Sequence, residues 1–387
     1  MRLCKICGKK DCNIHTFRLS NFKKIKDFSG SSPPEVFIGH YNYPFVFMGI
    51  LSPVNYGDTE LLSSPEKWHS EKLSIPEILG LRNQLIYCRT KGSIKNFNSN
   101  ITNSLQEVAI ASKPLATEFK LKGGLLNKNL ENTASIPLIK NAALVEKVRI
   151  EENPKVEPKV DYLINDKEVK ASEAIIELDK ARIKTSDVIK ILSAGLLGKI
   201  SRRKLVPTRW SITAVDDTLS KNRLKEIRYF PIISNIRVFH AEYLGNHYEF
   251  ILLPENYSFE VIEISLKSSG IWKDYEGFFG RKDYASYVTG AYYSNRVALT
   301  EYLEKIKHQA SCLVIRQVSQ EYTSPLGVGI LRQTSREAFS KPPETFLTLS
   351  DALESIQTRL KIPIETYTRE SKILENYKKQ NRLDRWF

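Results

Sequence analysis

Short segments of alternating hydrophobic and polar residues occur along most of this chain and predict β-strands. The predicted strands are residues 36–38, 45–50, 232–243, 247–253, 259–264 and 311–318. Gly245-Asn246 separates two of these segments, and a glycine-containing dipeptide of this kind is typical of the turn in a β-hairpin.

Hydrophobic residues at helical spacing predict helices between the strands. The predicted helices are residues 74–87, 173–181, 291–307, 330–339 and 351–360. Ser74 is the expected N-cap of the first helix, and Pro76 suits its first turn. A further helix is expected after Ser211 or Thr213, with Asp216-Asp217 in its first turn favouring the helix dipole or holding a metal. The mixture predicts an α+β fold with mixed or antiparallel sheets.

Gly30–Pro34 is expected to be an irregular loop, because it combines glycine, serines and two prolines. The hydroxyls of Ser31 and Ser32 and free backbone amides would suit a phosphate or another anion. His40 follows the first predicted strand and is a candidate general acid or base. Ser31, Ser32 and His40 are therefore candidate catalytic residues. The alternative is an ordinary loop beside a structural histidine.

The most basic window of the chain is Gly198–Trp210, which has five cationic side chains, no acidic side chain and a tryptophan at its end. Arginine binds phosphate oxygens, and an aromatic ring can stack on a base. The window therefore predicts a nucleic-acid contact, and the alternative is a solvated basic loop. The candidate phosphate-binding residues are Arg202, Arg203, Lys204 and Arg209.

Residues 272–296 alternate aromatic side chains with charged residues and glycine. We predict that this stretch stacks bases, with Arg281 and Arg296 holding phosphates and Tyr284 in the same groove. Asp283 is a further candidate for acid–base or metal chemistry. The alternative is a core loop whose tyrosines pack inside the domain.

The net charge of the chain indicates which class of partner it binds. Lys+Arg exceed Asp+Glu by 58 − 44 = 14 in 387 residues, and 41% of the residues are hydrophobic, as in globular proteins. Such an excess favours a polyanion, either nucleic acid or an anionic membrane surface. We expect no membrane-spanning helix, because no stretch of about 18 apolar residues occurs. No apolar signal segment precedes the first cysteines, so a cytoplasmic location is expected.

Three of the five cysteines lie within the first twelve residues, and a histidine follows them. The spacing Cys-x2-Cys-x4-Cys-x2-His lets two ligand pairs close on one tetrahedral Zn²⁺. The ligands would be Cys4, Cys7, Cys12 and His15. Four protein ligands leave no open coordination position, so the expected role is structural; the alternative is chance clustering. Cys88 and Cys312 stand alone and are expected to be buried thiols.

The end of the chain combines a glutamine, an aliphatic residue and two adjacent aromatics: Gln380, Leu383, Trp386 and Phe387. In one turn of tight helix the last three would share an apolar side that a partner can bury. The pattern resembles the PIP box, the peptide that docks replication and repair proteins onto the sliding clamp PCNA. The alternative is an anchor that folds back onto its own domain.

In this order, the N-terminal cysteines, Gly30–Pro34, Gly198–Trp210, Phe279–Tyr284 and the tail resemble the archaeal Nre family of DNA repair proteins, in its zinc-bearing NreA branch. The resemblance covers essentially the whole chain. It implies an archaeal cytoplasmic protein that protects against DNA damage through PCNA, with a large N-terminal and a smaller C-terminal domain. The expected boundaries are 1–20 for the zinc knuckle, 21–290 and 291–367 for the two domains, and 368–387 for a helix and the flexible tail.

We therefore expect a DNA-binding repair protein that reaches damaged DNA through PCNA, with no membrane partner. Two forms of this function stay open. In the first, the protein is a phosphoester hydrolase acting on DNA, either a nuclease or an enzyme that removes adenylate from 5′ ends. In the second, it is a non-catalytic adaptor that binds DNA and recruits other repair factors to the clamp.

Overall fold

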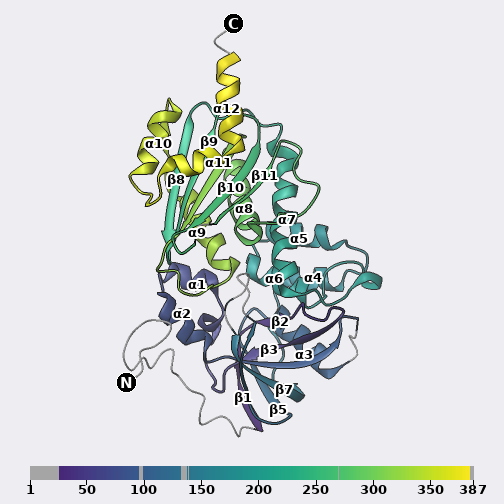
Figure 1. Cartoon of the computed structure of the whole chain (residues 1–387). Helices are drawn as coiled ribbons and strands as arrows, with labels where there is room; N and C mark the ends of the chain where they lie inside the picture. Colours follow the sequence, from purple (N-terminus) through teal and green to yellow (C-terminus); the bar gives the residue numbers. More distant parts are fainter. Residues whose placement is uncertain (1–25, 96–98, 132–136, 138, 269, 384–387) are drawn as a thin grey trace, which may run out of the picture. The chain divides into compact units, whose positions relative to one another are not determined.

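The computed structural model describes residues 26–95, 99–131, 137, 139–268 and 270–383 (Figure 1). Within these residues the chain forms two mixed β-sheets and 12 α-helices, so the predicted α+β class is confirmed. The chain divides into two compact units, residues 1–218 with 323–327, and residues 219–322 with 328–387. The candidate zinc ligands, Trp386 and Phe387 lie outside the described residues.

The first unit contains a seven-stranded sheet with the order β1-β5-β7-β4-β3-β2, in which β6 also pairs with β7. Its strands are β1 (Asp27–Ser32), β2 (Val36–Ile38), β3 (Phe45–Ser52), β4 (Ile86–Ser93), β5 (Leu115–Leu121), β6 (Leu126–Glu131) and β7 (Ile139–Ile150). Its helices are α1 (Pro65–Ser70), α2 (Ile75–Arg82), α3 (Asn100–Ile110), α4 (Pro158–Asn165), α5 (Ala171–Lys180) and α6 (Thr185–Ser193). The β4–β7 pair is parallel, and the other pairs in this sheet are antiparallel.

One face of this sheet packs against α3. Leu105 and Val108 of α3 lie in the same buried cluster as Met48 of β3 and Phe119 of β5. Successive residues of a strand point to opposite faces, so β5 alternates between buried and more exposed positions along its length. The same cluster includes Ile94 and Leu205, which are the neighbours of Lys95 and Lys204 in the candidate site.

The second unit contains a six-stranded sheet with the order β11-β10-β12-β9-β8-β13. Its strands are β8 (Ile236–Tyr243), β9 (Asn246–Leu253), β10 (Ser258–Ser265), β11 (Ile271–Glu276), β12 (Ser311–Val318) and β13 (Glu344–Phe346). Its helices are α8 (Thr289–Ile306), α9 (Val328–Ser340), α10 (Leu349–Gln357), α11 (Ile364–Glu370) and α12 (Lys372–Leu383), and α7 (Thr208–Ile227) enters it from the first unit.

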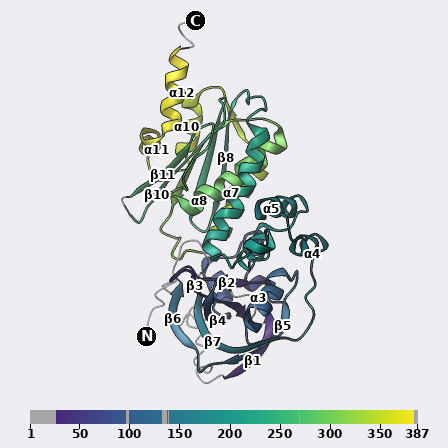
Figure 2. The same ribbon diagram turned by 90° about the vertical axis from the view of Figure 1, so that its right-hand side faces the viewer.

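Helices cover both faces of the second sheet (Figure 2). One buried cluster joins the sheet to α7, α8 and α9, and a separate cluster on the other face joins it to α10, α11 and α12. Every residue of β9 and β12 is buried as a result. This arrangement explains why these two strands are rich in hydrophobic residues on both sides.

The predicted hairpin and the strands over residues 36–38, 45–50, 259–264 and 311–318 are confirmed as β8–β9, β2, β3, β10 and β12. The helix predicted from Ser74 is capped as expected, because the Ser74 amide donates to Glu77 Oε2 at 2.7 Å. That helix ends at Arg82, however, and Ile86 begins β4. The prediction extended too far because a buried strand and a buried helix segment look alike over a few apolar residues.

The expectation of an irregular loop at Gly30–Pro34 is wrong for its first three residues. Gly30, Ser31 and Ser32 belong to β1, where they pair antiparallel with residues 115–117 of β5. A Cβ atom at Gly30 would collide with the carbonyl oxygen of Pro53. The glycine therefore permits a close approach between two backbone segments, and composition alone does not distinguish this role from loop flexibility.

The helix expected after Ser211 or Thr213 begins earlier, at Thr208. The Pro207 carbonyl accepts hydrogen bonds from the amides of Trp210 at 2.8 Å and Ser211 at 3.0 Å, and these bonds form the first turn. Asp216-Asp217 consequently lies inside α7, where both side chains are buried. A first-turn role for these carboxylates at the helix dipole is therefore ruled out.

Candidate nucleic-acid interface

The basic window from Gly198 onward is attached to the end of β4 in the first unit. The Leu205 amide donates to the Ile94 carbonyl at 2.9 Å, and the Val206 amide donates to the Ser193 carbonyl at 3.0 Å. These two bonds fix the extended segment that follows a short 3-10 turn at Ile200–Arg202. They bring Lys204 next to Lys95, a residue that follows β4.

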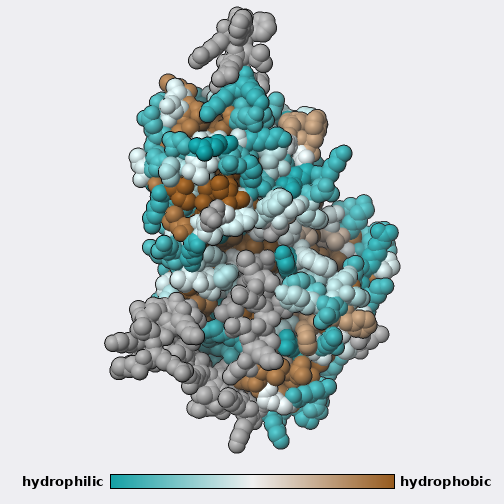
Figure 3. All heavy atoms as spheres, in the orientation of Figure 1, coloured by the Kyte–Doolittle hydropathy of each residue, from teal (hydrophilic) through white to brown (hydrophobic). Residues whose placement is uncertain are grey.

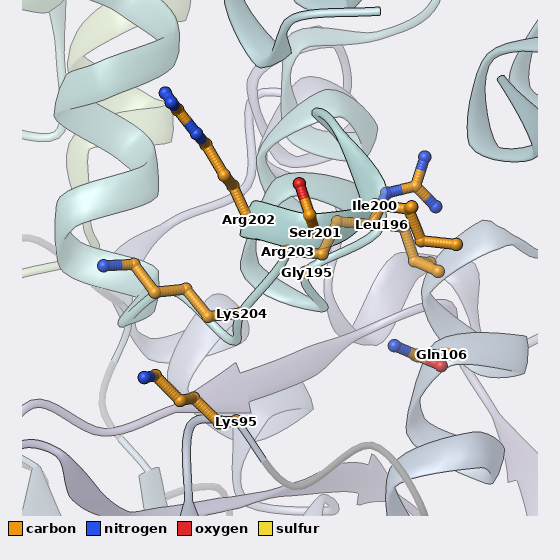
Figure 4. Close-up of a pocket in the computed structure, with 9 residues that line it drawn as sticks. All are labelled: Lys95, Gln106, Gly195, Leu196, Ile200, Ser201, Arg202, Arg203 and Lys204. Carbon is orange, nitrogen blue, oxygen red and sulfur yellow. The ribbon is translucent and has the colours of Figure 1, made fainter. Parts of the chain in front are cut away.

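Four cations of the first unit form what we call the cationic surface: Lys95, Arg202, Lys204 and Arg209. All four side chains are exposed, and no carboxylate of the described residues lies within ion-pair distance of any of them. Figure 4 shows the Lys95 and Lys204 side chains extending toward the same side, with Arg202 above them. Cations without acidic partners repel one another, so an anionic ligand would stabilise this arrangement.

A cavity of about 760 Å³ lies beside the cationic surface. Its lining residues are Lys95, Gln106, Gly195, Leu196, Ile200, Ser201, Arg202, Arg203 and Lys204. The Gln106 side chain is held by a hydrogen bond from Nε2 to the Ala194 carbonyl at 3.0 Å. The cavity thus offers a concave surface with cations along one side (Figure 4).

Arg203 has a different role from its neighbours. Its guanidinium donates to three backbone carbonyls, those of Gly198 at 2.8 Å, Ile164 at 2.8 Å and Asp166 at 2.9 Å. In Figure 4 this guanidinium points away from Lys95 and Lys204. Arg203 therefore holds the basic segment against the turn after α4, and three of its five N–H donors are used inside the protein.

Arg209 and His40 come together at the start of α7. The Ile38 amide donates to Thr208 Oγ1 at 3.0 Å, which connects β2 to the first residue of α7. Burial lowers the pKa of His40, and the charge of Arg209 lowers it further. Both effects disfavour the charged form of the His40 imidazole. Its ring contacts Tyr41 at a centroid distance of 4.1 Å.

Ser31 and Ser32 are engaged in the sheet. The Ser32 hydroxyl is buried and lies 2.5 Å from Thr117 Oγ1, and the Ser31 Oγ accepts a hydrogen bond from the Gly57 amide at 3.0 Å. Among the described residues, no hydrogen bond joins either serine to His40. The structure thus does not assemble these three residues into one hydrogen-bonded catalytic group.

In the second unit, Asp274 organises the loop between β11 and α8. Its carboxylate accepts hydrogen bonds from the amides of Ser286 at 3.3 Å, Tyr287 at 2.9 Å and Val288 at 2.7 Å. Arg281 Nη1 donates to the same carboxylate at 2.7 Å, so the positive charge of Arg281 is balanced by Asp274. This network connects the loop to the end of β11 and to the start of α8.

The same loop exposes other candidates. Tyr284 is 62% exposed, and Asp283 is also exposed, with its carbonyl accepting a bond from Arg281 Nε at 3.2 Å. Phe279 is exposed as well, at 91%. Aromatic rings are therefore available on this loop, while Arg281 serves mainly to fix its shape.

Arg296 does not lie on a surface, contrary to its predicted role as a phosphate ligand. It is 2% exposed, and its Nη1 donates to Glu276 Oε2 at 2.7 Å. Tyr257 donates its hydroxyl to the other oxygen of Glu276 at 2.6 Å. A surface arginine and a buried arginine look alike in sequence, because burial depends on the partner that the fold supplies.

Sequence reasoning missed Lys95, Tyr41, Tyr43 and Phe45 as parts of the interface. The three aromatic side chains are 59%, 40% and 57% exposed. A usable signal was present, since three aromatics within five residues interrupt the buried pattern of the neighbouring strands. Their proximity to the basic window is a tertiary feature.

The structure describes the two predicted buried thiols but not the predicted zinc ligands. Cys88 and Cys312 are free and buried, as predicted, and burial raises the pKa of both thiols. No cluster of His, Cys, Asp or Glu able to hold a metal occurs in the part of the chain that the structure describes. The predicted zinc ligands lie outside that part.

Among the described residues, no helix is long and apolar enough to cross a membrane. On the face drawn in Figure 3, hydrophobic residues form separate brown patches bordered by hydrophilic residues in teal. Fold and site together define an α+β protein with a cationic surface suited to a polyanion.

The chain belongs to the archaeal Nre family. The family model for the N-terminal part, "Archaeal Nre, N-terminal", matches residues 6–273, and "Archaeal Nre, C-terminal" matches residues 276–386. The chain is 32% identical to DNA repair protein NreA of Archaeoglobus fulgidus over 371 residues, covering 92% of this chain and 91% of the relative. It is 31% identical to DNA repair protein NreB of the same organism, covering 96% and 95%.

A third relative, DNA repair protein NreA of Haloferax volcanii, is 32% identical over 361 residues, which cover 88% of this chain and 85% of the relative. No solved structure matches the chain significantly. The family assignment agrees with the resemblance seen in the sequence, and it places the chain among proteins named for DNA repair.

Proposed function

We propose that this protein is a DNA-binding repair factor whose cationic surface holds the phosphate backbone of DNA. The observation that carries the proposal is that Lys95, which follows β4, lines the same cavity as Arg202 and Lys204 of the basic window. Among the described residues, neither these three cations nor the exposed Arg209 has an acidic partner. The names of the curated relatives support DNA as the polyanion. Phosphate contacts of this kind release counterions, which makes binding depend steeply on salt.

The test is the salt dependence of binding to a short DNA duplex. Each lost phosphate contact reduces the slope of log K against log salt by about 0.9. Lys204→Ala combined with Arg209→Ala should therefore reduce the slope by about 2. The matched control is Lys113→Ala combined with Lys122→Ala, two exposed lysines of the same unit outside the cationic surface. An unchanged slope in the first variant, or equal losses in both, would show that the surface is misplaced.

The proposal includes recruitment by PCNA through the C-terminal tail. Gln380 and Leu383 lie in the last turns of α12, and the polar residues before them, Lys378 and Lys379, are exposed. α12 extends past the end of the sheet of its unit (Figure 2). Deleting residues 380–387 should abolish binding to PCNA and leave the salt slope for DNA unchanged. Undiminished clamp binding would end this part of the proposal.

The structural zinc site remains a proposal that rests on Cys4, Cys7, Cys12 and His15. Purified protein should contain one zinc per chain, and Cys4→Ser with Cys7→Ser should remove it. A native protein free of zinc would exclude the site. We also propose a cytoplasmic location, in keeping with the two buried free thiols.

Phosphoester processing is the second candidate function. The observation that favours it is the proximity of His40 to Arg209, whose charge adds to burial in lowering the pKa of the imidazole. An imidazole near a phosphate-binding cation can act as a general base toward an attacking water. Defined DNA substrates blocked at the 5′ or 3′ end, including adenylated 5′ ends, would be incubated with wild type and His40→Gln. Turnover lost in the variant supports an enzyme, whereas the absence of turnover with retained binding supports the adaptor.

A further inference from the structure

Four large aromatic side chains of the first unit are exposed close to the cationic surface. Tyr41, Tyr43, Phe45 and Trp210 are 59%, 40%, 57% and 44% exposed, and we call them the aromatic platform. Nearby Phe37, by contrast, is 4% exposed. Leaving these rings partly in water forgoes part of the free energy that their burial would contribute. A cluster of this kind marks a site that a ligand covers.

The platform is held in shape by backbone bonds. The Phe45 amide donates to the Asn42 carbonyl at 2.8 Å, and this bond closes the turn that carries the tyrosines. The rings of Tyr43 and Trp210 have centroids 5.0 Å apart and planes inclined by 54°. The platform therefore combines the turn before β3 with the first turn of α7.

The same backbone connections place cations beside the rings. The Ile94 amide donates to the Pro44 carbonyl at 3.1 Å, next to Tyr43, and the Ile94 carbonyl accepts the Leu205 amide at 2.9 Å. Lys95 and Lys204 are the immediate neighbours of these two residues, and Arg209 precedes Trp210 in sequence. Rings for bases and cations for phosphates thus occur on one part of the molecule.

We infer that the platform binds unpaired bases, so that the preferred ligand of this site is single-stranded DNA or an unpaired DNA end. This inference rests on the proposed function. Bases inside a duplex stack on one another and offer no free face, whereas an unpaired strand offers a face to each ring. A protein partner would also cover exposed aromatics, but the cations without acidic partners favour a ligand that carries a negative charge for every base.

The test compares an oligothymidylate of about 15 nucleotides, within the range of single-strand sites, with a duplex of equal length. The variants are Tyr41→Ala with Trp210→Ala, and the rescue pair Tyr41→Phe with Trp210→Phe. Tyr162→Ala is the control, because Tyr162 is 64% exposed in the same unit but lies in α4. Thermal unfolding of each variant shows whether the fold is retained.

Wild type should bind the single strand more tightly than the duplex. The alanine pair should weaken single-strand binding by about tenfold or more, since stacking on one ring contributes roughly fivefold to a hundredfold. The phenylalanine pair and Tyr162→Ala should retain it. The fluorescence of a 2-aminopurine placed in the strand should decrease when the strand binds wild type, because the base stacks on a ring. It should not decrease when the strand is bound by the alanine pair.

Equal affinity of wild type for both DNA forms, with no effect of the alanine pair, would overturn the inference and leave salt-dependent DNA binding intact. Binding of neither form would instead remove the proposed function itself. If the alanine pair does not fold, the fluorescence of 2-aminopurine in a strand bound to wild type tests the inference. Unquenched fluorescence in that bound strand would contradict stacking.

Discussion

Arg296 and Glu276 form an ion pair away from solvent, with Nη1 and Oε2 2.7 Å apart and both residues 2% exposed. The guanidinium also lies over the rings of Tyr292 and Tyr293, at 5.5 Å and 5.3 Å from their centroids. The pair joins the end of β11 to α8 and therefore stabilises the second unit.

Replacing Arg296 with alanine should destabilise the protein by about 3–5 kcal/mol, because it leaves the Glu276 carboxylate buried without its cation. Urea unfolding measures this change, and the exposed Lys282→Ala should shift stability by less than about 0.5 kcal/mol. A stable Arg296→Ala protein with a smaller salt slope for DNA would instead support the phosphate role that the sequence suggested.

Replacing Asp274 with alanine should release the loop before α8. Three backbone amides and Arg281 would lose their acceptor, at a cost of about 1–3 kcal/mol for each donor that stays buried. Hydrogen exchange at the amides of residues 286–288 should accelerate strongly. Asp283→Ala on the same loop is the control, since its side chain is exposed; equal protection in both variants would refute the role given to Asp274.

The stability contributed by His247 should decrease as pH rises. Burial alone would lower the pKa of His247, but hydrogen bonds to Glu249 at 2.8 Å and Glu242 at 3.3 Å outweigh burial and raise it. Arg359 also bonds to Glu249, at 2.8 Å and 3.0 Å, and limits this effect. A raised folded-state pKa means that the stabilisation is complete below the unfolded value of about 6.5 and is lost above the folded value.

Urea unfolding of wild type and His247→Asn at about pH 5.5 and about pH 9 measures this difference. The gap in unfolding free energy between the two proteins should be larger at the lower pH. A gap that is equal at both pH values, or larger at the higher one, would contradict the raised pKa.

DNA binding should strengthen as pH falls through the range in which His40 titrates. Burial and the charge of Arg209 disfavour the imidazolium in the free protein, and a bound phosphate would offset the charge of Arg209. Binding of DNA and protonation of His40 should therefore favour each other. Affinity for DNA at about pH 5.5 should therefore exceed that at about pH 7.5 by more in wild type than in His40→Gln. Identical pH profiles would place His40 away from the phosphates.

Hydrophobic alternation, glycine turns and helix caps are local properties, and they predicted β2, β3, the β8–β9 hairpin, β12 and the cap at Ser74 correctly. The net charge and the basic window likewise indicate a polyanion from the amino-acid sequence alone. The family could also be inferred from motifs in their order along the chain, because each motif is a local pattern.

Local patterns did not predict whether an individual charged side chain is buried with a partner or exposed to solvent. Arg203 donates to three backbone carbonyls, and Arg296 forms an ion pair with Glu276. Lys204, in contrast, is exposed beside Lys95. In the amino-acid sequence these three residues are equally basic, and nothing local distinguishes their roles. Whether a charged group is buried with a partner or exposed without one depends on contacts between residues far apart in the chain. These contacts form only when sheets and helices pack, and the desolvation that follows sets the role of each cation.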